Sequence, residues 1–204
     1  MAEQGVRWPL VSNKIRGGKL SNTFGAGVRT QTKKDPEKPG QNIKNPDGKT
    51  DKLFPKPHQG WDFYAANGTP CYAIHDGKVI STASDGDYGR RVVIELDTVK
   101  VDGGKVYAMY AHLSSYVVGI GEKVKKNDVI GYTGSTGNAS NTDPHLHFEL
   151  RNVAAPGKGI SGRMSPMRLF KPLPLKNAVM DCSGLDDLWT FEDGKLVKKS
   201  QCSQ

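Results

Sequence analysis

Residues 145–150 read His-Leu-His-Phe-Glu-Leu, and the interpretation of the whole chain starts from this short segment. On a β-strand, side chains two positions apart point to the same face and lie about 6.6 Å apart. His145 and His147 then share one face, while Leu146 and Phe148 pack into the core on the other. Two adjacent imidazoles on a polar face suit one metal ligand and one nearby base. Alone, this pair is a weak signal, because many such histidines lie on surfaces or in cores.

Short runs of β-branched and aromatic residues bounded by glycine turns fill the chain from residue 61 to residue 151. The tripeptide Asp102-Gly103-Gly104 between two of them is a good hairpin signal. Together with 24 glycines and 12 prolines in 204 residues, the pattern predicts a mainly β protein with a compact antiparallel sheet. The expected strands cover residues 71–74, 78–82, 91–96, 105–113, 128–132 and 145–150.

Two regions differ from this strand-rich part. Residues 30–57 combine many lysines with acidic residues and prolines and offer almost nothing to bury, which predicts a long basic surface loop. Prolines at 172 and 174 indicate a boundary. We therefore expect one domain over residues 1–174, with its core at about 8–151. A small C-terminal appendage would follow over residues 175–204, with a short helix around 184–191.

The composition limits the classes of function. The net charge of +8 fits either a soluble basic protein or one attracted to a polyanion. The chain shows no nucleic-acid-binding motif, so nucleic acid is not expected as a partner. No apolar run reaches roughly 18 residues, so no transmembrane segment is expected. The first five residues show no charged segment leading into an apolar run, so no signal peptide is visible.

The three cysteines allow two hypotheses, one about a disulfide bridge and one about a catalytic thiol. A bridge between Cys182 and Cys202 would close a loop worth about 3 kcal/mol and would imply an oxidising compartment. Cys71 and His112 would be the residues of a cysteine hydrolase. That alternative is weaker, because a catalytic thiol usually lies at a helix start, whereas Cys71 follows Pro70 into a strand-like run.

A second pair of chemically active residues lies in the segment His-Gln-Gly-Trp-Asp at residues 58–62. On a straight strand, His58 and Asp62 would be about 13 Å apart, too far to share one ion. Pro57 and Gly60 argue against a regular helix, which would make them neighbours. The chain must therefore bend near Gly60 if both side chains belong to one site.

Together with His147, this pair forms a set of donors that zinc favours. His58, Asp62 and His147 supply two neutral imidazoles and one carboxylate. Three protein ligands leave a fourth position for water, which is typical of a catalytic zinc site. His112 and His145 then have no assigned role, although both are expected to lie close enough to the metal site to take part in it.

The motifs, taken in order, resemble one known family. They are H-Q-G-W-D at 58–62, Tyr-Ala-His-Leu at 110–113, and Gly-Tyr-Thr-Gly-Ser-Thr-Gly at 131–137 leading to Pro-His-Leu-His-Phe-Glu at 144–149. This pattern is similar to the lysostaphin/LytM-type zinc endopeptidases over about residues 8–151. The resemblance implies a compact antiparallel β domain with the active groove on one sheet face. The chain departs from the family in three respects. Its loop before His58 is longer, and residues 52–54 lack the tyrosine that helps stabilise the oxyanion in several members. The appendage after Pro174 has no counterpart in the family.

The resemblance also implies a site and an activity. His58, Asp62 and His147 would bind one Zn²⁺ per chain, and His112 with His145 would be the catalytic pair. The expected function is a metalloendopeptidase that hydrolyses peptide cross-links of bacterial peptidoglycan, outside the cell or in the periplasm.

The resemblance allows more than one substrate and more than one role. The partners are stem or cross-bridge peptides, and the bond is either glycyl-glycine or D-alanyl-diamino acid. A monomer is expected, with an immunity or delivery partner if the protein is an antibacterial toxin. The alternative is a non-catalytic wall-binding or regulatory module, because some relatives keep the fold and lose the chemistry.

Overall fold

The structure is a computed structural model, which describes residues 5–32, 35–39, 41–43, 53–170, 188–192 and 195–199. Within these ranges the regular elements are β-strands and short 3₁₀ turns. The strands are β1 (Gly25–Thr32), β2 (Leu53–His58), β3 (Trp61–Tyr64), β4 (Pro70–Tyr72), β5 (Gly77–Ser84), β6 (Arg90–Val101), β7 (Gly104–Tyr116), β8 (Lys123–Val124), β9 (Val129–Thr133), β10 (His145–Arg151), β11 (Arg163–Met164), β12 (Leu188–Glu192) and β13 (Lys195–Lys199). The 3₁₀ turns are η2 (Arg16–Gly18), η3 (Leu20–Asn22), η4 (Gly137–Ala139) and η5 (Pro166–Arg168).

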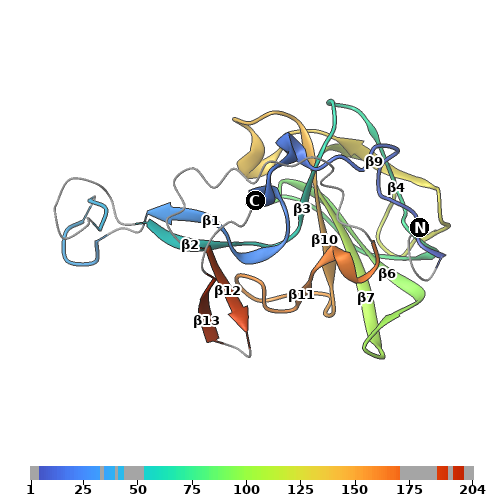
Figure 1. Cartoon of the computed structure of the whole chain (residues 1–204). Helices are drawn as coiled ribbons and strands as arrows, with labels where there is room; N and C mark the ends of the chain where they lie inside the picture. The colour runs from blue at the N-terminus through green and yellow to red at the C-terminus, as the bar shows by residue number, and fades with distance from the viewer. Residues whose placement is uncertain are drawn as a thin grey trace.

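Nine of the strands form one antiparallel sheet (Figure 1). Its main path runs β11-β10-β7-β6-β5-β8, β3 pairs with β10, and β9 pairs with both β4 and β7. The predicted hairpin joins β6 to β7, where Val101 pairs with Gly104. Asp102 and Gly103 both have positive φ, 50° and 75°, as the tight hairpin turn requires. The mainly β, antiparallel fold predicted from the sequence is therefore confirmed.

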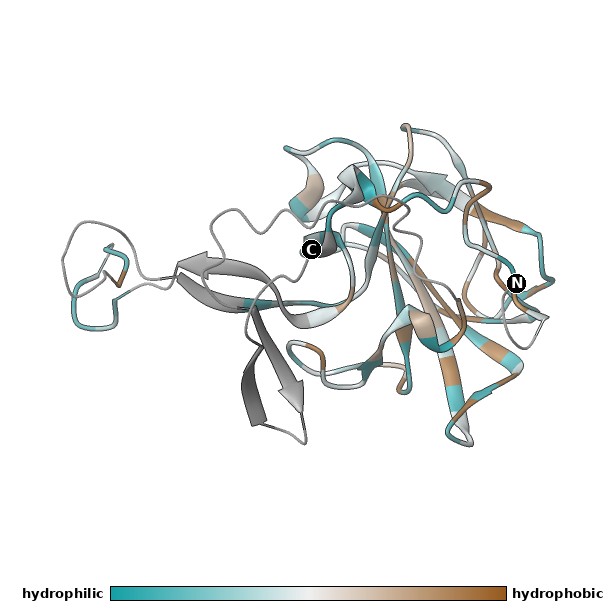
Figure 2. Ribbon diagram, viewed as in Figure 1, coloured by the Kyte–Doolittle hydropathy of each residue, from teal (hydrophilic) through white to brown (hydrophobic). Residues whose placement is uncertain are grey.

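One face of this sheet is covered by apolar side chains. Hydrophobic and hydrophilic residues are mixed along the strands (Figure 2), and on β10 the two kinds alternate at every position, His-Leu-His-Phe-Glu-Leu-Arg. On β10, Leu146, Phe148 and Leu150 are fully buried in this core. The N-terminal segment covers it, with the Trp8 ring stacked 4.6 Å from that of Phe170. The other face of β10 is thereby left for polar side chains.

Two expectations about the less regular regions need correction. β1 and β2 pair with each other, with Thr30 opposite Pro55 and Thr32 opposite Leu53, and they extend away from the main sheet (Figure 1). Strand pairing thus continues into both ends of the loop predicted over residues 30–57, because the polar residues there form backbone hydrogen bonds without needing a core.

The prediction of a short helix around residues 184–191 is also wrong for residues 188–191, the part of that segment that the structure describes. Leu188–Glu192 is a strand, β12, and it pairs with β13. Its last four residues, Trp-Thr-Phe-Glu, alternate apolar and polar side chains, a period that favours a strand over a helix. The boundary at 174 and both Cys182 and Cys202 lie outside the described residues.

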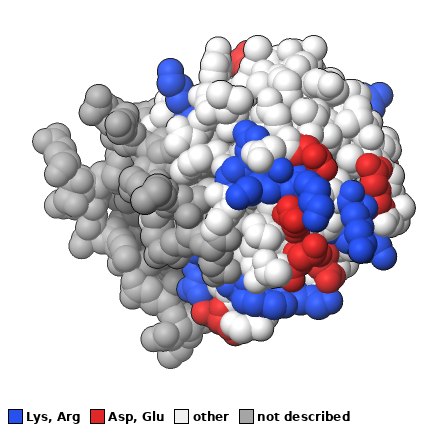
Figure 3. Space-filling model, turned by 90° about the vertical axis from the view of Figure 1, so that its right-hand side faces the viewer, with Lys and Arg blue, Asp and Glu red and all other residues white. Residues whose placement is uncertain are grey.

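Surface charge is mixed on the face shown in Figure 3. Basic and acidic side chains are interleaved there, so the net charge of +8 does not form a continuous basic patch on this face. Some surface lysines are neutralised by a neighbouring carboxylate, as in the ion pairs Lys125–Asp76 at 3.0 Å and Lys105–Glu95 at 2.7 Å. In the described part of the chain, no helix has the length and apolar character needed to cross a membrane.

Candidate metal centre and groove

Strand register places the first two candidate ligands opposite each other. His147 on β10 pairs with Asp62 on β3, and residues directly opposite in an antiparallel pair project to the same face. The Asp62 Oδ1 atom lies 2.8 Å from His147 Nδ1. Because the neighbouring residues Leu146 and Phe148 are held in the core, the alternation of β10 fixes His147 on the polar face.

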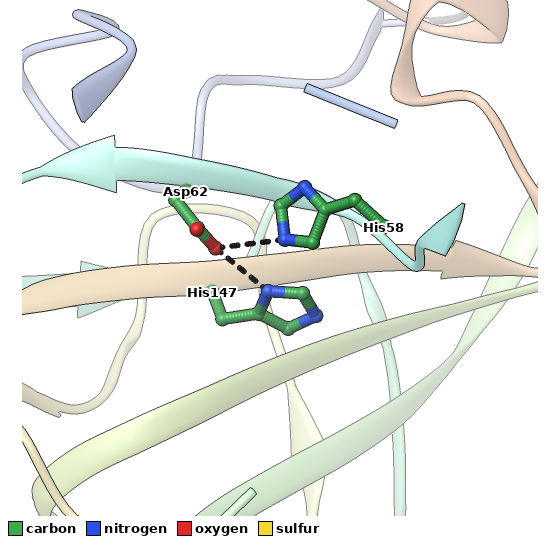
Figure 4. A group of neighbouring side chains, drawn as sticks. All are labelled: His58, Asp62 and His147. Atoms are coloured by element: carbon green, nitrogen blue, oxygen red, sulfur yellow. Dashed lines mark hydrogen bonds and ion pairs between the residues drawn. The ribbon is translucent and has the colours of Figure 1, made fainter. Parts of the chain in front are cut away.

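A sharp bend brings the third candidate ligand to the same point. β2 ends at His58 and β3 begins at Trp61, so the bend predicted near Gly60 is present. A Cβ atom at Gly60 would lie 2.2 Å from the carbonyl oxygen of Phe148, which only glycine avoids. His58 Nε2 comes to 3.2 Å from Asp62 Oδ1 (Figure 4). The structure therefore brings together the three residues proposed from sequence as ligands.

The donor atoms of His58, Asp62 and His147 fit a zinc ion. They all lie within 4.8 Å of one another, and the three side chains are buried. His58 Nδ1 lies 2.8 Å from the carbonyl oxygen of Thr23, which only accepts, so Nε2 keeps its lone pair for a metal. His147 Nε2 faces Glu149 Oε1 at 3.2 Å, which likewise leaves Nδ1 for the metal. Such outer hydrogen bonds are typical of zinc-binding histidines.

Charges around the centre are strongly coupled. Burial opposes ionisation of Asp62, but His58 and His147 outweigh it and hold the pKa of Asp62 well below its usual range. Burial also opposes protonation of His147, but the hydrogen bonds to Asp62 and Glu149 outweigh that effect and raise the pKa of His147 to about 9. Two carboxylates thus favour a positive charge here, as a metal site requires.

Behind His147 lies a buried polar network that the sequence analysis missed. Glu149 is fully buried, and its Oε2 atom accepts hydrogen bonds from Arg151 Nε at 2.7 Å and Arg163 Nε at 2.9 Å. Its Oε1 atom accepts one from the Tyr88 hydroxyl at 2.5 Å. Burial opposes ionisation of Glu149, but His147 and the other partners outweigh it and lower its pKa to about 2. The carboxylate is therefore an anchored acceptor for His147.

One signal for this network was present in the sequence. Glu149 and Arg151 continue the two-residue period of His145 and His147, so the same alternation places all four on one face. Tyr88 lies in the turn before β6, where no periodicity indicates its direction. Residues 52–54, where the family's tyrosine is missing, have no described side chains.

His112 reaches the same face through a β-bulge. On a regular strand it would point into the core, because Ala111 already faces His147. The β6–β7 register instead shifts between the pairs Arg90–Leu113 and Val92–Tyr110, so that β7 has one extra residue. His112 has a φ of 61°, and its ring centre lies 5.7 Å from that of His147. The bulge thus turns His112 toward the candidate metal centre.

His112 and His145 lie side by side, with ring centres 5.0 Å apart. His112 Nδ1 is 2.9 Å from the carbonyl oxygen of Thr136, and His145 Nδ1 is 2.9 Å from that of Asp143. Both rings therefore carry the proton on Nδ1 and expose an Nε2 lone pair. Burial, with His147 and His145, lowers the pKa of His112 to about 4, and burial also lowers the pKa of His145. Two neutral imidazoles near a metal centre are suited to accept a proton.

Comparison with known proteins places this arrangement in a family. The family model described as "Peptidase family M23" matches residues 56–159, a range that includes all five of these residues. The chain belongs to peptidase family M23. This family consists of zinc metallopeptidases. The resemblance to the lysostaphin/LytM-type endopeptidases that the motifs indicated is therefore confirmed.

Curated members of family M23 are similar over the same part of the chain. "Peptidoglycan DD-endopeptidase ShyA" of Vibrio cholerae is 40% identical over 94 residues, which are 46% of this chain and 20% of that protein. "Glycyl-glycine endopeptidase ALE-1" of Staphylococcus capitis is 43% identical over 93 residues, 45% of this chain and 24% of that protein. The chain therefore spans about a quarter or less of the length of these relatives.

A solved structure supports the M23 fold over a larger part of the chain. It is titled "Identification and structural characterization of LytU", has a TM-score of 0.50 and is 25% identical. The alignment covers 81% of this chain and 99% of that one. The antiparallel sheet seen here is thus the fold of an M23 peptidase domain.

The site of this M23 domain opens into a groove of about 680 Å³. All five histidine and aspartate side chains described above line it, together with Arg16, Asn22, Lys56, Pro57, Gln59, Asp87, Tyr88, Asn138, Ala139, Thr142, Gly157, Lys158, Gly159 and Arg163. Cys71 is not among them. It is fully buried, and burial raises the pKa of its thiol, so the structure gives no support to a cysteine hydrolase.

Proposed function

We propose that this chain is a zinc-dependent endopeptidase that hydrolyses peptide cross-links of bacterial peptidoglycan outside the cell or in the periplasm. Membership of family M23 supports a peptidase, and the relatives named for peptidoglycan or glycyl-glycine cleavage support a wall substrate. One observation carries the proposal. The donor atoms of His58, Asp62 and His147 cluster within 4.8 Å in an open groove beside two neutral imidazoles.

The residues divide into two roles in this proposal. His58 Nε2, Asp62 Oδ1 and His147 Nδ1 would hold the zinc ion. When bound, the ion supplies Lewis-acid chemistry, polarising a carbonyl and lowering the pKa of a coordinated water. His112 or His145 would accept the proton of the attacking water at Nε2 and return a proton to the leaving amine. Because both Nδ1 atoms donate to backbone carbonyls, the Nε2 lone pair of each ring stays available to accept that proton.

Digestion of purified peptidoglycan, with and without a chelator, tests the proposal. We expect the zinc-loaded protein to release peptides that mass analysis assigns to a cut cross-link, and the chelator to abolish the release. Asp62→Asn should lose bound zinc, whereas His112→Ala should keep zinc and lose turnover. A folded, zinc-loaded protein that releases no peptide would show that the chain is a non-catalytic module.

A further inference from the structure

Unequal charge in the groove points to the kind of cross-link that it binds. Four basic side chains line the groove, those of Arg16, Lys56, Lys158 and Arg163. Among the residues that the structure describes, the acidic side chains in the same lining are Asp62, which belongs to the proposed metal centre, and Asp87. Arg163 is neutralised by Glu149, at 2.9 Å. Within the described lining, three cations therefore remain against one exposed carboxylate, and a zinc ion at the proposed metal centre would add positive charge.

Lys158 is presented by a loop with a defined shape. Arg163 Nη1 donates to the carbonyl oxygens of Gly157 at 2.7 Å and Gly159 at 2.8 Å, the residues on either side of Lys158. The same guanidinium holds Glu149 through Nε, so one side chain ties the loop to the network behind His147. The backbone around Lys158 is thus fixed relative to the metal centre, while its own side chain stays exposed.

Basic side chains lie on both sides of the centre. The Lys158 loop lies against β2, since a Cβ atom at Gly159 would be 3.8 Å from Pro57, between Lys56 and His58. Arg16 lies on the His145 side, where its guanidinium is 3.9 Å from the exposed Asp143. This ion pair is long and its Asp143 carboxylate is exposed to solvent, so it neutralises Arg16 only weakly. An extended peptide crossing the centre would therefore pass between cations.

From this arrangement we infer that the groove selects a cross-link that carries a free carboxylate beside the scissile bond, with Lys158 and Lys56 as specificity-determining residues. The inference rests on the proposed function and narrows it. A D-alanyl-diaminopimelate cross-link has a carboxylate one carbon from the scissile amide nitrogen, whereas a glycyl-glycine bridge is uncharged along its length. Cations held at a groove rim favour the first substrate, because they gain charge-assisted hydrogen bonds with it alone.

Two matched peptides test this inference. Each is a D-alanyl-diaminopimelate cross-linked dimer, one with the carboxylate beside the scissile amide free and the other with it converted to a carboxamide; pentaglycine is the third substrate. We expect kcat/KM to be about tenfold higher for the free acid than for the carboxamide, the size of one charge-assisted hydrogen bond. That ratio should shrink as salt is raised.

Variants locate the effect at the groove. Lys158→Gln and Lys56→Gln should each lower kcat/KM for the free acid several-fold more than for the carboxamide, so that the ratio of the two rates falls toward one. Lys78→Gln, an exposed lysine on β5 outside the groove, is the matched control and should change neither rate. Binding of the free acid to the His112→Ala protein should weaken in the same two lysine variants.

The outcomes separate the inference from the function on which it rests. Equal rates on acid and carboxamide, or faster cleavage of pentaglycine, would overturn the inference while leaving a wall endopeptidase in place. Lysine variants that reduce both rates alike would also overturn it, since they would report a loss of general binding. Failure to cut any of the three peptides or whole peptidoglycan would instead refute the proposed function.

Discussion

Glu149 shows how much of this site depends on one residue that is expected to touch neither metal nor substrate. It accepts from Tyr88, Arg151 and Arg163 and faces His147 Nε2, all without exposure to solvent. Removing its charge would leave two guanidinium groups without their buried partner, which destabilises a protein by about 3–5 kcal/mol. It would also release the His147 ring from its fixed tautomer.

We therefore expect Glu149→Gln to lower zinc affinity by about 10–100-fold, the range typical of lost outer-shell partners. Titration of the folded protein with a competing chelator measures this affinity, and thermal unfolding of the metal-free protein measures the stability loss. Glu37→Gln, which changes an exposed carboxylate, is the matched control and should affect neither. Wild-type zinc affinity in Glu149→Gln would contradict the positioning role.

At the same scale, sequence reasoning could propose site residues only where the residue type itself indicates a chemistry. Two histidines and an aspartate in motif spacing are recognisable as candidate ligands because few other side chains bind zinc. The position of Glu149 could have been predicted from the sequence, since it shares the two-residue period of His145 and His147. Arg163 was not, because an arginine twelve residues beyond β10 gives no indication that its guanidinium turns back to a glutamate and a loop.

Among the elements, the bulge in β7 is the feature that a periodic pattern could not predict. A two-residue period assigns His112 to the core face, yet the extra residue moves it to the site face and returns Leu113 to the core. The bulge is held by the backbone N–H of His112, which donates to the carbonyl oxygen of Tyr88 at 2.9 Å. The side chain's direction depends on this pairing.

A pair of substitutions at His112 tests the bulge independently of catalysis. At a φ of 61° a residue with a Cβ is strained by about 1 kcal/mol relative to glycine. Both His112→Gly and His112→Ala remove the imidazole, so we expect both to be inactive and the glycine variant to be the more stable by about 1 kcal/mol. Urea denaturation measures the difference. A more stable alanine variant would mean that the backbone at 112 is not left-handed.

The bend between β2 and β3 gives a second prediction at this scale. A methyl group at Gly60 would meet the Phe148 carbonyl at 2.2 Å, so Gly60→Ala must push β3 away from β10. Overpacking of this kind costs about 1–3 kcal/mol, and here it also separates His58 from Asp62. We expect lower stability and weaker zinc binding together. Gly119→Ala is the matched control, because its Cβ would meet only Glu122 Oε2, at 3.9 Å, and should change neither quantity.

For the molecule as a whole, the sequence predicted the sheet well and its surroundings less well. The strands of the sheet are marked by β-branched runs and glycine turns, and their burial depends on local alternation. The β1–β2 pair and the β12–β13 hairpin lie outside the nine-stranded sheet. The residues that extend β1 and β2 into the predicted loop are mostly polar and show no periodic apolar signal, whereas β12 does show alternation that sequence reasoning assigned to a helix. The sequence likewise did not predict which residues cover the C-terminal end of the core.

That closure is made by Leu169 and Phe170, and it leads to a prediction about truncation. Both are fully buried, and Phe170 stacks on Trp8 at 4.6 Å and meets Phe148 edge-on at 5.9 Å. The β12–β13 hairpin, by contrast, forms a sheet of its own. A chain ending at residue 174 should therefore keep the unfolding temperature, zinc affinity and peptidase activity of the full chain.

A chain ending at residue 168 should lose them, because loss of one large buried aromatic side chain alone costs about 3–5 kcal/mol. It would also expose Trp8, so the N-terminal segment would lose its hold on the sheet behind β10. Thermal unfolding of the two truncated proteins beside the full chain measures the difference. Equal stability of both would place the end of the folding unit before Leu169, whereas unfolding of both would make residues 175–204 part of it.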